Sequence, residues 1–382
     1  MKARILHVVY SLEPGGMENG VVNMANKLDP CHYELGVLFL EKEGGMAGRL
    51  PHSTGKFVLM KKPGLDLGVL PSFIDALEGF RPDIVHTHNL GPLIYTALAR
   101  GMARVRFQLV HGEHASLTQV DLSPKKRLQR SFLYSACQAI HTVGHHMTVE
   151  LENGHLSRQP VHTLANGVDA SRFCPSADGS SLKESLLGVS PGSPVLALVG
   201  RFGSYKGHKA LLEAFIKIGK EHTDCLLLFV GGGGEMEEGI KGIARDHPHS
   251  GRIRFTGFQE DPLPFYQLAD LLVVPSENEG LSNSILEAMA CGTPVLTNNS
   301  CGATELVRDG INGFVNPTND PGGLAASILQ ILGRSHKELD SISVASREFV
   351  CRYYSLEAMA AGYSVVYSRF SEIGDGVGRN CG

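Results

Sequence analysis

The sequence predicts an α/β protein of two Rossmann-like domains, and three observations support this fold class. The chain has 382 residues, which is more than one hydrophobic core usually supports. Short apolar runs alternate with helix-like segments along the chain, as in parallel sheets built from βαβ units. A strand, a glycine turn and a helix, which together open a Rossmann-like domain, follow one another both at the N-terminus and from residue 195.

Composition excludes several classes of protein. Apolar residues make up 42% of the chain and charged residues 19%, as in folded proteins that are soluble in water. The net charge of −4 gives no overall attraction to nucleic acid or anionic lipid, so no nucleic-acid partner is expected. Eight cysteines without a CxxC pair indicate reduced thiols in the cytoplasm. No apolar run approaches the ~20 residues of a membrane span. The apolar stretch at the start of the chain is too short for a signal peptide. Peripheral contact with the inner face of the membrane stays open.

The N-terminal half begins with a predicted strand at 5–9 and a loop that contains Gly15 and Gly16. Two consecutive glycines let backbone amides approach a bound anion, although an ordinary tight turn explains them equally well. The dinucleotide fingerprint GxGxxG is absent, which argues against a nicotinamide-dependent dehydrogenase. Further strands are predicted at 35–40, 56–59, 83–86, 107–110, 140–143 and 161–164.

Two groups of titratable residues in this half allow more than one interpretation. His86 and His88 follow a predicted strand end, and a metal site would need further ligands that the sequence does not supply. We therefore expect these histidines to line a loop, and no metal site is predicted. A basic cluster precedes an apolar helix and comprises Lys125, Lys126, Arg127 and Arg130. The cluster is interpreted as a solvated helix face, with contact to an anionic or lipid-linked acceptor as the weaker alternative.

A stretch rich in Ser, Gly and Pro, residues 174–194, marks the linker between the domains. It sets the predicted domains at 1–178 and 193–356. In the second domain, strands are predicted at 195–199, 226–230, 253–258, 271–274, 294–297, 305–307 and 313–315, with a helix at 320–332. A last helix is predicted at about 357–372.

The second domain is organised around residues 273–296. A buried strand ends at Pro275, and a short polar loop with Glu277 and Glu279 follows. Ser282 and Asn283 are good N-cap residues for the helix that comes next. The N-terminus of this helix faces the carboxyl end of the sheet, where free N–H groups and the helix dipole favour phosphate.

Glu279 and Glu287 flank this anion site, with seven residues between them. At the rise of a helix, the two carboxylates are roughly 8 Å apart along the axis, which is about the span of a diphosphate. One carboxylate could then hold hydroxyls on each side of the diphosphate, as in a nucleotide sugar. A helix with one exposed glutamate beside a polar loop remains the simpler alternative at this point.

Two cations lie five residues apart after the first strand of the second domain, Arg201 and Lys206. Arg binds phosphate oxygens in a fork and Lys acts as a point charge, so both can act on one diphosphate. The chain contains no Asp-x-Asp pair to hold a divalent metal. The two cations could therefore replace a metal by stabilising charge on a leaving nucleoside diphosphate.

These motifs resemble the Glu-x7-Glu signature of retaining, nucleotide-sugar-dependent glycosyltransferases, and more narrowly glycosyltransferase family 4. Segments that match the pattern in order are Gly15-Gly16-Met17-Glu18, Asn166-Gly167-Val168-Asp169, Gly200-Arg201-Phe202 with Lys206-Gly207, and Glu305-Leu306-Val307. The resemblance covers roughly residues 1–370. It implies the GT-B fold, in which two Rossmann-like domains face each other across a cleft. The first domain, with the last helix packed back on it, would bind the acceptor, and the second would bind the donor.

The resemblance also assigns roles to individual residues. The catalytic residues would be Glu279, Arg201, Lys206 and His114. His114 is matched to the family's histidine beside the donor sugar, and His111 is the second possible match. The donor would contact Gly15, Gly16, Phe258, Gly280, Leu281, Ser282, Asn283 and Glu287.

The implied reaction is transfer of a sugar, with retention, from a UDP- or GDP-sugar to a hydroxyl of a saccharide or lipid-linked acceptor. No metal or other cofactor is expected. The general pattern is similar to transferases of bacterial exopolysaccharide or lipopolysaccharide assembly. A sugar-nucleotide epimerase of the same architecture and a non-catalytic sugar-nucleotide sensor are the alternatives.

Overall fold

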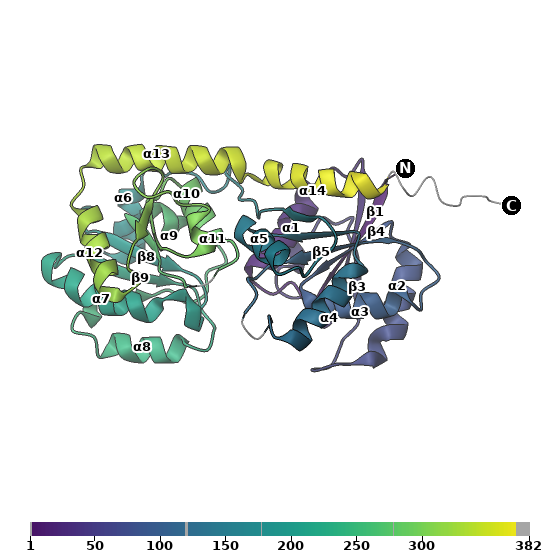
Figure 1. Ribbon diagram of the computed structural model, residues 1–382. Helices are drawn as coiled ribbons and strands as arrows, with labels where there is room; N and C mark the ends of the chain where they lie inside the picture. Colours follow the sequence, from purple (N-terminus) through teal and green to yellow (C-terminus); the bar gives the residue numbers. More distant parts are fainter. Residues whose placement is uncertain (1, 119–120, 177, 278, 372–382) are drawn as a thin grey trace. The chain divides into compact units, whose positions relative to one another are not determined.

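The computed structural model describes residues 2–118, 121–176, 178–277 and 279–371. It divides the chain into two compact units (Figure 1). The first unit ends at Gly167 and includes the C-terminal segment from Leu356, and the second unit is Val168–Ser355. The boundaries predicted from the sequence, 178 and 193, lie later in the chain than the observed one.

The first unit contains a parallel sheet of seven strands in the order β3-β2-β1-β4-β5-β6-β7. The strands are β1 Ala3–Val9, β2 Tyr33–Phe39, β3 Gly55–Val58, β4 Ile84–His88, β5 Gln108–Glu113, β6 Ala139–Thr142 and β7 Val161–Thr163. The helices are α1 Gly16–Lys27, η1 Ala47–Arg49, η2 Leu67–Val69, α2 Leu70–Phe80, α3 Leu90–Arg100, α4 Pro124–Ser135, α5 His145–Asn153 and α14 Leu356–Ser371. All seven predicted strands are present.

The last helix, α14, packs on the first unit. Its buried side chains recur at helical spacing: Leu356, Met359, Tyr363, Val366 and Tyr367. They form one cluster with buried side chains of β1, β4 and α1. Lys27 on α1 also forms an ion pair with Glu357, at 2.8 Å between Nζ and Oε1. This apolar stripe is what returns the end of the chain to the first unit.

The second unit contains a parallel sheet of six strands in the order β10-β9-β8-β11-β12-β13. The strands are β8 Val195–Val199, β9 Leu226–Val230, β10 Ile253–Phe255, β11 Leu271–Val274, β12 Val295–Asn298 and β13 Phe314–Asn316. The helices are α6 Gly179–Leu182, η3 Lys183–Leu187, η4 Ser204–Lys206, α7 His208–Glu221, α8 Glu237–Arg245, η5 Ser250–Arg252, α9 Leu263–Leu268, α10 Asn283–Ala290, α11 Cys301–Thr304, α12 Pro321–Leu332 and α13 His336–Tyr353. The central strands β8, β9 and β11 are continuous apolar runs, as expected for strands covered on both faces.

Two strand predictions in the second unit need correction. The strand predicted at 305–307 is wrong, because the N–H groups of Leu306 and Val307 both donate to the carbonyl of Ala303 and continue the turn of α11. A run of three residues is too short for periodicity to separate a strand from a buried turn. The strand predicted at 253–258 ends at Phe255, and Gly257, at φ +69°, turns the chain.

The segment that was predicted as a linker belongs to the second unit. The ammonium of Lys183 is buried and donates to both carboxylate oxygens of Asp270, at 2.9 and 2.7 Å. Asp270 in turn accepts a hydrogen bond from the backbone N–H of Val195, at the start of β8. A polar anchor 87 residues away in sequence therefore holds this stretch, and local composition does not reveal it.

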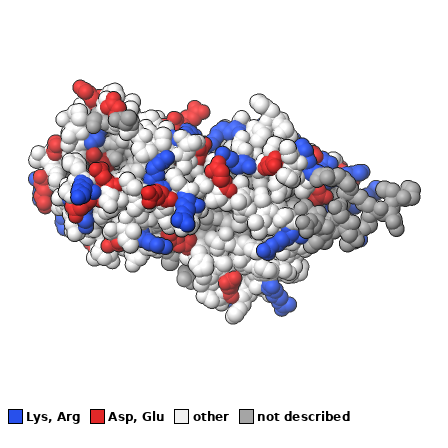
Figure 2. Space-filling model, turned by 90° about the horizontal axis from the view of Figure 1, so that it is seen from above, with Lys and Arg blue, Asp and Glu red and all other residues white. Residues whose placement is uncertain are grey.

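The surface and the helices agree with the composition. On the face in Figure 2, Lys and Arg side chains are interspersed with Asp and Glu, and neither sign forms a continuous patch there. Among the residues that the structure describes, no helix is both long enough and apolar enough to span a bilayer.

Candidate active site

Three of the predicted site residues lie in the loops that follow the two central strands of the second unit. β8 and β11 pair in parallel at the centre of the sheet. After β8 the chain continues to β9 and β10 at one edge, and after β11 it continues to β12 and β13 at the other. In open α/β sheets, ligands bind beside the carboxyl ends of strands at such a reversal of strand order. The loop after β8 carries Arg201 and Lys206, and the loop after β11 carries Glu279.

Glu279 and Lys206 contact each other directly. The Lys206 Nζ donates to Glu279 Oε1 at 2.6 Å, and the hydroxyl of Ser276 donates to the same oxygen at 2.6 Å. The Glu279 side chain is only 7% exposed, and that of Lys206 is 21% exposed. Burial alone would raise the pKa of Glu279, but the charge and hydrogen bond of Lys206, with the hydroxyls of Ser276 and Ser282, lower it. Glu279 is therefore an ionised carboxylate beside a cation.

The stretch Gly280 to Asn283 connects this pair to helix α10. Ser282 is the N-cap residue, as predicted, but its side chain makes no capping bond to the helix. Its hydroxyl instead lies 3.1 Å from that of Ser284. Leu281 is buried and packs in the turn, so it is a support for the loop rather than a polar contact. The Ser282 side chain therefore leaves the first N–H groups of α10 uncapped, and such groups favour an anion.

Gly302 on α11 supports the same loop and was not singled out from the sequence. A Cβ at this position would lie 2.3 Å from the carbonyl oxygen of Glu279 and 2.5 Å from that of Gly280. Only glycine therefore allows α11 to approach the loop so closely. A glycine at the start of a helix was the one available signal, and it is common in many contexts.

Glu287 is oriented by a buried tyrosine. The Tyr266 hydroxyl donates to Glu287 Oε2 at 2.6 Å, and Tyr266 is fully buried. Burial, and then the charge of Glu287, raise the pKa of Tyr266, so its hydroxyl keeps its proton. Tyr266 lies on α9, 21 residues before Glu287, and nothing in the sequence indicated this partnership.

Arg201 is not brought into contact with the Lys206–Glu279 pair. It is exposed, and it forms no ion pair with any residue that the structure describes. It follows Gly200, and a Cβ on Gly231 would lie 2.2 Å from the carbonyl oxygen of Gly200, so the loops after β8 and β9 are in close contact. Phe258, in the loop after β10, is 61% exposed. Arg201 and Phe258 are thus available to a ligand, whereas Lys206 is already paired.

The predicted residues of the first unit lie at the ends of β1 and β5. Gly15 is the N-cap of α1 and Gly16 is its first residue. A Cβ on Gly15 would lie 2.2 Å from Glu18 Oε2, so the carboxylate of Glu18 folds over the start of α1. The helix dipole favours a carboxylate there, which agrees with a capping role for Glu18.

The structure distinguishes the two candidate histidines. His111 lies within β5, is fully buried, and contacts the Thr87 hydroxyl at 2.9 Å and Glu113 Oε1 at 3.3 Å. His114 follows β5 and is partly exposed, with its Nε2 2.9 Å from His88 Nδ1. Burial lowers the pKa of His114 to about 4, so its ring is neutral at pH 7. Of the two residues, His114 is the more exposed.

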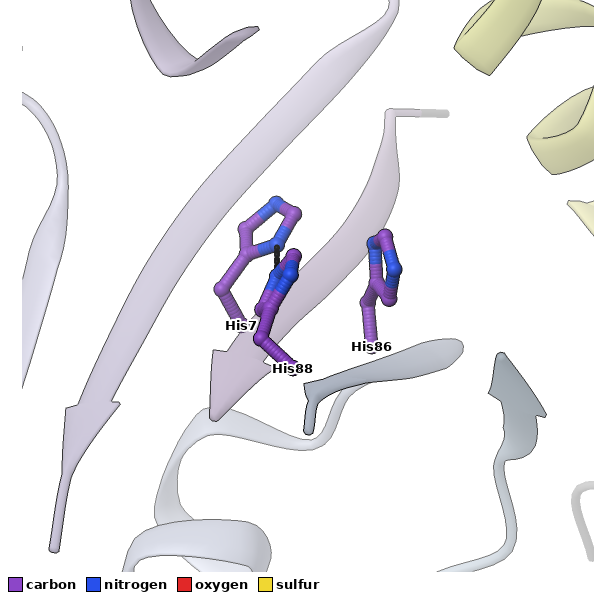
Figure 3. A group of neighbouring side chains, drawn as sticks. All are labelled: His7, His86 and His88. Carbon is purple, nitrogen blue, oxygen red and sulfur yellow. Dashed lines mark hydrogen bonds between the residues drawn. The ribbon is translucent and has the colours of Figure 1, made fainter. Parts of the chain in front are cut away.

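The expectation that His86 and His88 line a loop is wrong. Both lie in β4, both are buried, and His88 Nε2 is 3.1 Å from His7 Nδ1 on β1 (Figure 3). The strand extends two residues beyond its predicted end because these imidazoles fill the interior of the sheet and find polar partners there. The sequence did not indicate His7 as their neighbour, because it lies 81 residues before His88.

The basic cluster on α4 is not the uniformly solvated face that was predicted, because one of its four residues is buried. Arg130 is buried, and its guanidinium donates to Glu113 Oε1 and, at 3.0 Å, to Asp121 Oδ1. Lys125 is exposed, and so are two apolar side chains on the same helix, Leu128 at 75% and Phe132 at 76%. The face of α4 turned to solvent is therefore apolar as well as basic.

Comparison with known proteins agrees with this arrangement. The profile of the Glycosyltransferase Family 4 domain matches residues 14–172, and that of Glycosyl transferases group 1 matches residues 186–348. The chain is 34% identical to the lipopolysaccharide core biosynthesis glycosyltransferase LpsE of Rhizobium meliloti, over 45% of this chain and 48% of the relative. The matched region therefore spans about half the length of that relative.

A second relative and a solved structure match over more of their length. The chain is 28% identical to the UDP-Gal:alpha-D-GlcNAc-diphosphoundecaprenol alpha-1,3-galactosyltransferase of Escherichia coli, over 67% of each chain. The crystal structure of Anabaena Alr3699/HepE in complex with UDP and glucose superposes with a TM-score of 0.81 and 19% identity, over 95% of this chain and 99% of the other.

The two matched profiles lie in the order and at the places that the two units occupy, and the structural likeness is to a GT-B protein. The chain therefore belongs to the family 4-like glycosyltransferases of the GT-B fold and is an enzyme that transfers sugars.

Proposed function

We propose that the enzyme transfers a sugar from a UDP-sugar to an acceptor hydroxyl with retention of the anomeric configuration. The observation that carries the proposal is the partly buried Lys206–Glu279 pair before the start of α10, at the reversal point of a parallel sheet. At this position a cation can bind the diphosphate of a nucleotide sugar, and a carboxylate can bind its sugar. Lys206 would bind the diphosphate and Glu279 would accept hydrogen bonds from sugar hydroxyls.

The remaining residues would complete the donor site. The exposed guanidinium of Arg201 would bind the diphosphate and take up charge as the sugar leaves. Glu287, oriented by Tyr266, would hold the ribose hydroxyls, and the start of α10 would present N–H groups to phosphate.

In the reaction, the bond from the anomeric carbon to the diphosphate breaks and a bond to the acceptor oxygen forms on the same face. The acceptor proton would pass to the leaving diphosphate. This account uses no metal or other cofactor.

The similar proteins support uridine as the base. The galactosyltransferase of Escherichia coli is named for UDP-Gal, and the Anabaena structure holds UDP and glucose. We therefore expect UDP, and neither GDP nor ADP, to raise the thermal unfolding midpoint of this protein. A ligand at about 100 times its dissociation constant adds about 2.7 kcal/mol to the free energy of unfolding. A thermal-shift titration measures this directly.

Two variants make the titration specific. Glu287→Gln should reduce the shift with UDP, because the carboxylate proposed to hold the ribose loses its charge. Glu213→Gln, on the outer part of α7 with its side chain 47% exposed, should leave the shift unchanged. If only GDP raises the thermal unfolding midpoint, the proposed base is guanosine rather than uridine. If UDP raises the midpoint equally in Glu287→Gln and Glu213→Gln, Glu287 does not bind the nucleotide.

The stereochemistry and the need for an acceptor separate the remaining alternatives. NMR spectra of the product should show the same anomeric configuration as the donor, and an inverted product would refute retention. An epimerase would instead change a UDP-sugar without any acceptor. A non-catalytic sensor would bind UDP and release no free UDP in the presence of a donor and an acceptor.

The acceptor is proposed to be a saccharide carried on a lipid, in the assembly of a cell-surface polysaccharide or glycolipid. The similar proteins are named for lipopolysaccharide core biosynthesis and for a diphosphoundecaprenol acceptor. The face of α4 agrees with work at the cytoplasmic surface of a membrane. Lys125, Leu128 and Phe132 are exposed and spaced three and four residues apart, so they share one side of the helix.

Vesicle binding tests this surface. Phe132→Ser should weaken sedimentation with vesicles of phosphatidylglycerol and phosphatidylcholine roughly tenfold or more, because burial of one aromatic side chain is lost. Val344→Ser, at an apolar residue of α13 that is 58% exposed, should bind as the unchanged protein does. Equal binding of both variants would contradict a membrane role for α4.

A further inference from the structure

Three histidines meet inside the first unit, on two neighbouring strands. β1 and β4 pair in parallel with His7 directly opposite His86. Successive side chains of a strand alternate between the two faces, so His88, two residues after His86, lies on the same face. The pattern His-x-His on β4 therefore brings both of its imidazoles to His7, as Figure 3 shows.

The distances between the three rings suit a metal ion. His7 Nδ1 and His88 Nε2 are 3.1 Å apart, and the ring centroids of His86 and His88 are 4.2 Å apart. One ring nitrogen of each histidine lies within 4.8 Å of those of the other two. Bonds of about 2.0–2.1 Å to tetrahedral Zn²⁺ place ligand nitrogens roughly 3.3 Å apart. The nitrogens of His7 and His88 are already at about this separation, and a shift of up to about 1.5 Å of the His86 ring would close the set.

The protein does not fully satisfy these rings by itself. All three are at most 1% exposed, and the buried Nε2 of His7 has no hydrogen-bond partner among the described residues. The ion would bind the other nitrogen of this ring, Nδ1, which faces His88 at 3.1 Å. The trio contains neither a carboxylate nor a thiolate, and neutral imidazoles suit Zn²⁺, Co²⁺, Ni²⁺ or Cu²⁺ rather than Mg²⁺ or Ca²⁺.

We propose that His7, His86 and His88 form a binding site for one divalent transition-metal ion of the Zn²⁺ class. The ion would have three imidazole ligands and a fourth position for water. It would join β1 to β4 at the centre of the sheet of the first unit. Lys206, Glu279 and Glu287, which are proposed to hold the donor, belong to the second unit and are not among the ligands of this site.

For His86 and His88, neighbouring side chains already provide the outer contacts that metal-bound histidines normally have. His88 Nδ1 lies 2.9 Å from His114 Nε2. His86 Nδ1 lies 2.6 Å from the Tyr367 hydroxyl, and its Nε2 lies 2.8 Å from His141 Nε2, so a bond through either nitrogen leaves the other with a partner. An ion bound to Nε2 of His88 would place the proton of this ring on Nδ1. His114 Nε2 would then be an acceptor, which connects the metal site to the candidate histidine of the active site.

The experiment uses the full-length protein after removal of metal with a chelator and exchange into metal-free buffer. Addition of Zn²⁺ should give one tightly retained ion per chain and a higher thermal unfolding midpoint. Addition of Co²⁺ should give the intense visible absorption bands of a four-coordinate site. His7→Gln and His88→Gln should each weaken Zn²⁺ binding by at least the 10- to 100-fold that loss of an outer contact costs. His111→Gln, equally buried on β5 but outside the trio, should retain the ion.

The outcomes separate this site from nonspecific binding. Retention of less than one ion, or a weak octahedral Co²⁺ spectrum, overturns the proposal, and so does equal binding by His7→Gln and the unchanged protein. The Co²⁺ spectrum of the unchanged protein decides the case even if a variant fails to fold. The affinity for UDP is measured in parallel, so that failure of the metal site and failure of the proposed transferase function are distinguished.

Discussion

Replacement of Lys206 by alanine is expected to lower the rate of sugar transfer about 100- to 1000-fold, as removal of one group that stabilises developing charge usually does. The variant loses the cation proposed to bind the diphosphate, and it also leaves the buried carboxylate of Glu279 without the partner 2.6 Å away. We expect the loss mainly in kcat/KM for the donor, measured by UDP release with a saturating acceptor. Glu279→Gln should show a loss of similar size, because it keeps the shape of the side chain and removes the charge.

A neighbouring lysine provides the matched control. Lys209, three residues later on α7, is exposed and lies 3.9 Å from the carboxylate of Glu213, which is also exposed. Lys209→Ala removes the same charge three residues away, on α7 rather than on η4, and should keep full activity. Circular dichroism and the thermal midpoint show whether Lys206→Ala remains folded. Full activity in a folded Lys206→Ala would remove this residue from the mechanism.

Arg130→Met is expected to cost about 3–5 kcal/mol of the free energy of unfolding, the usual cost of removing one partner from a buried ion pair. The side chains of Arg130 and Glu113 are each 6% exposed, and the Tyr134 hydroxyl donates to the same carboxylate oxygen. Burial would raise the pKa of Glu113, but His111, Arg130 and Tyr134 together lower it. Glu113 therefore stays charged, and loss of Arg130 leaves that charge in the interior. Urea denaturation measures the change.

A double-mutant cycle tests whether the effect comes from the pair. Glu113→Gln combined with Arg130→Met should cost less than the two single changes added together, because the uncompensated charge is removed. Lys125→Met, on the exposed side of the same helix, should change stability by no more than about 0.5 kcal/mol. Additive losses in the cycle would show that Arg130 acts through packing alone.

Much of the fold follows from local pattern. The apolar runs at β8, β9 and β11 coincide with the predicted strands, and α10 follows Ser282, which was predicted as an N-cap residue. The strand at 305–307 was wrong because a short apolar run is compatible with a buried turn. Local periodicity determines which segments are helices and strands, but it carries little information when the run is short.

The candidate site was accessible from sequence only in part. Glu279, Glu287, Arg201 and Lys206 stand out because carboxylates and cations follow strand ends at informative spacings. The residues that support them, Tyr266 and Gly302, were missed, since their roles depend on a hydrogen bond and a close approach between distant segments. The interpretation of Arg130 as solvated was wrong for the same reason, because its partner Glu113 lies on another element.

The sequence by itself determined the order of the elements, the two-domain class and the segments that carry the chemistry, because these depend on residues close together in the chain. Only the tertiary structure decided which side chains meet. It paired Lys206 with Glu279 across 73 residues and brought His7 beside His86 and His88. The order of strands in a sheet sets such contacts, and that order results from packing of the whole unit rather than from any local pattern.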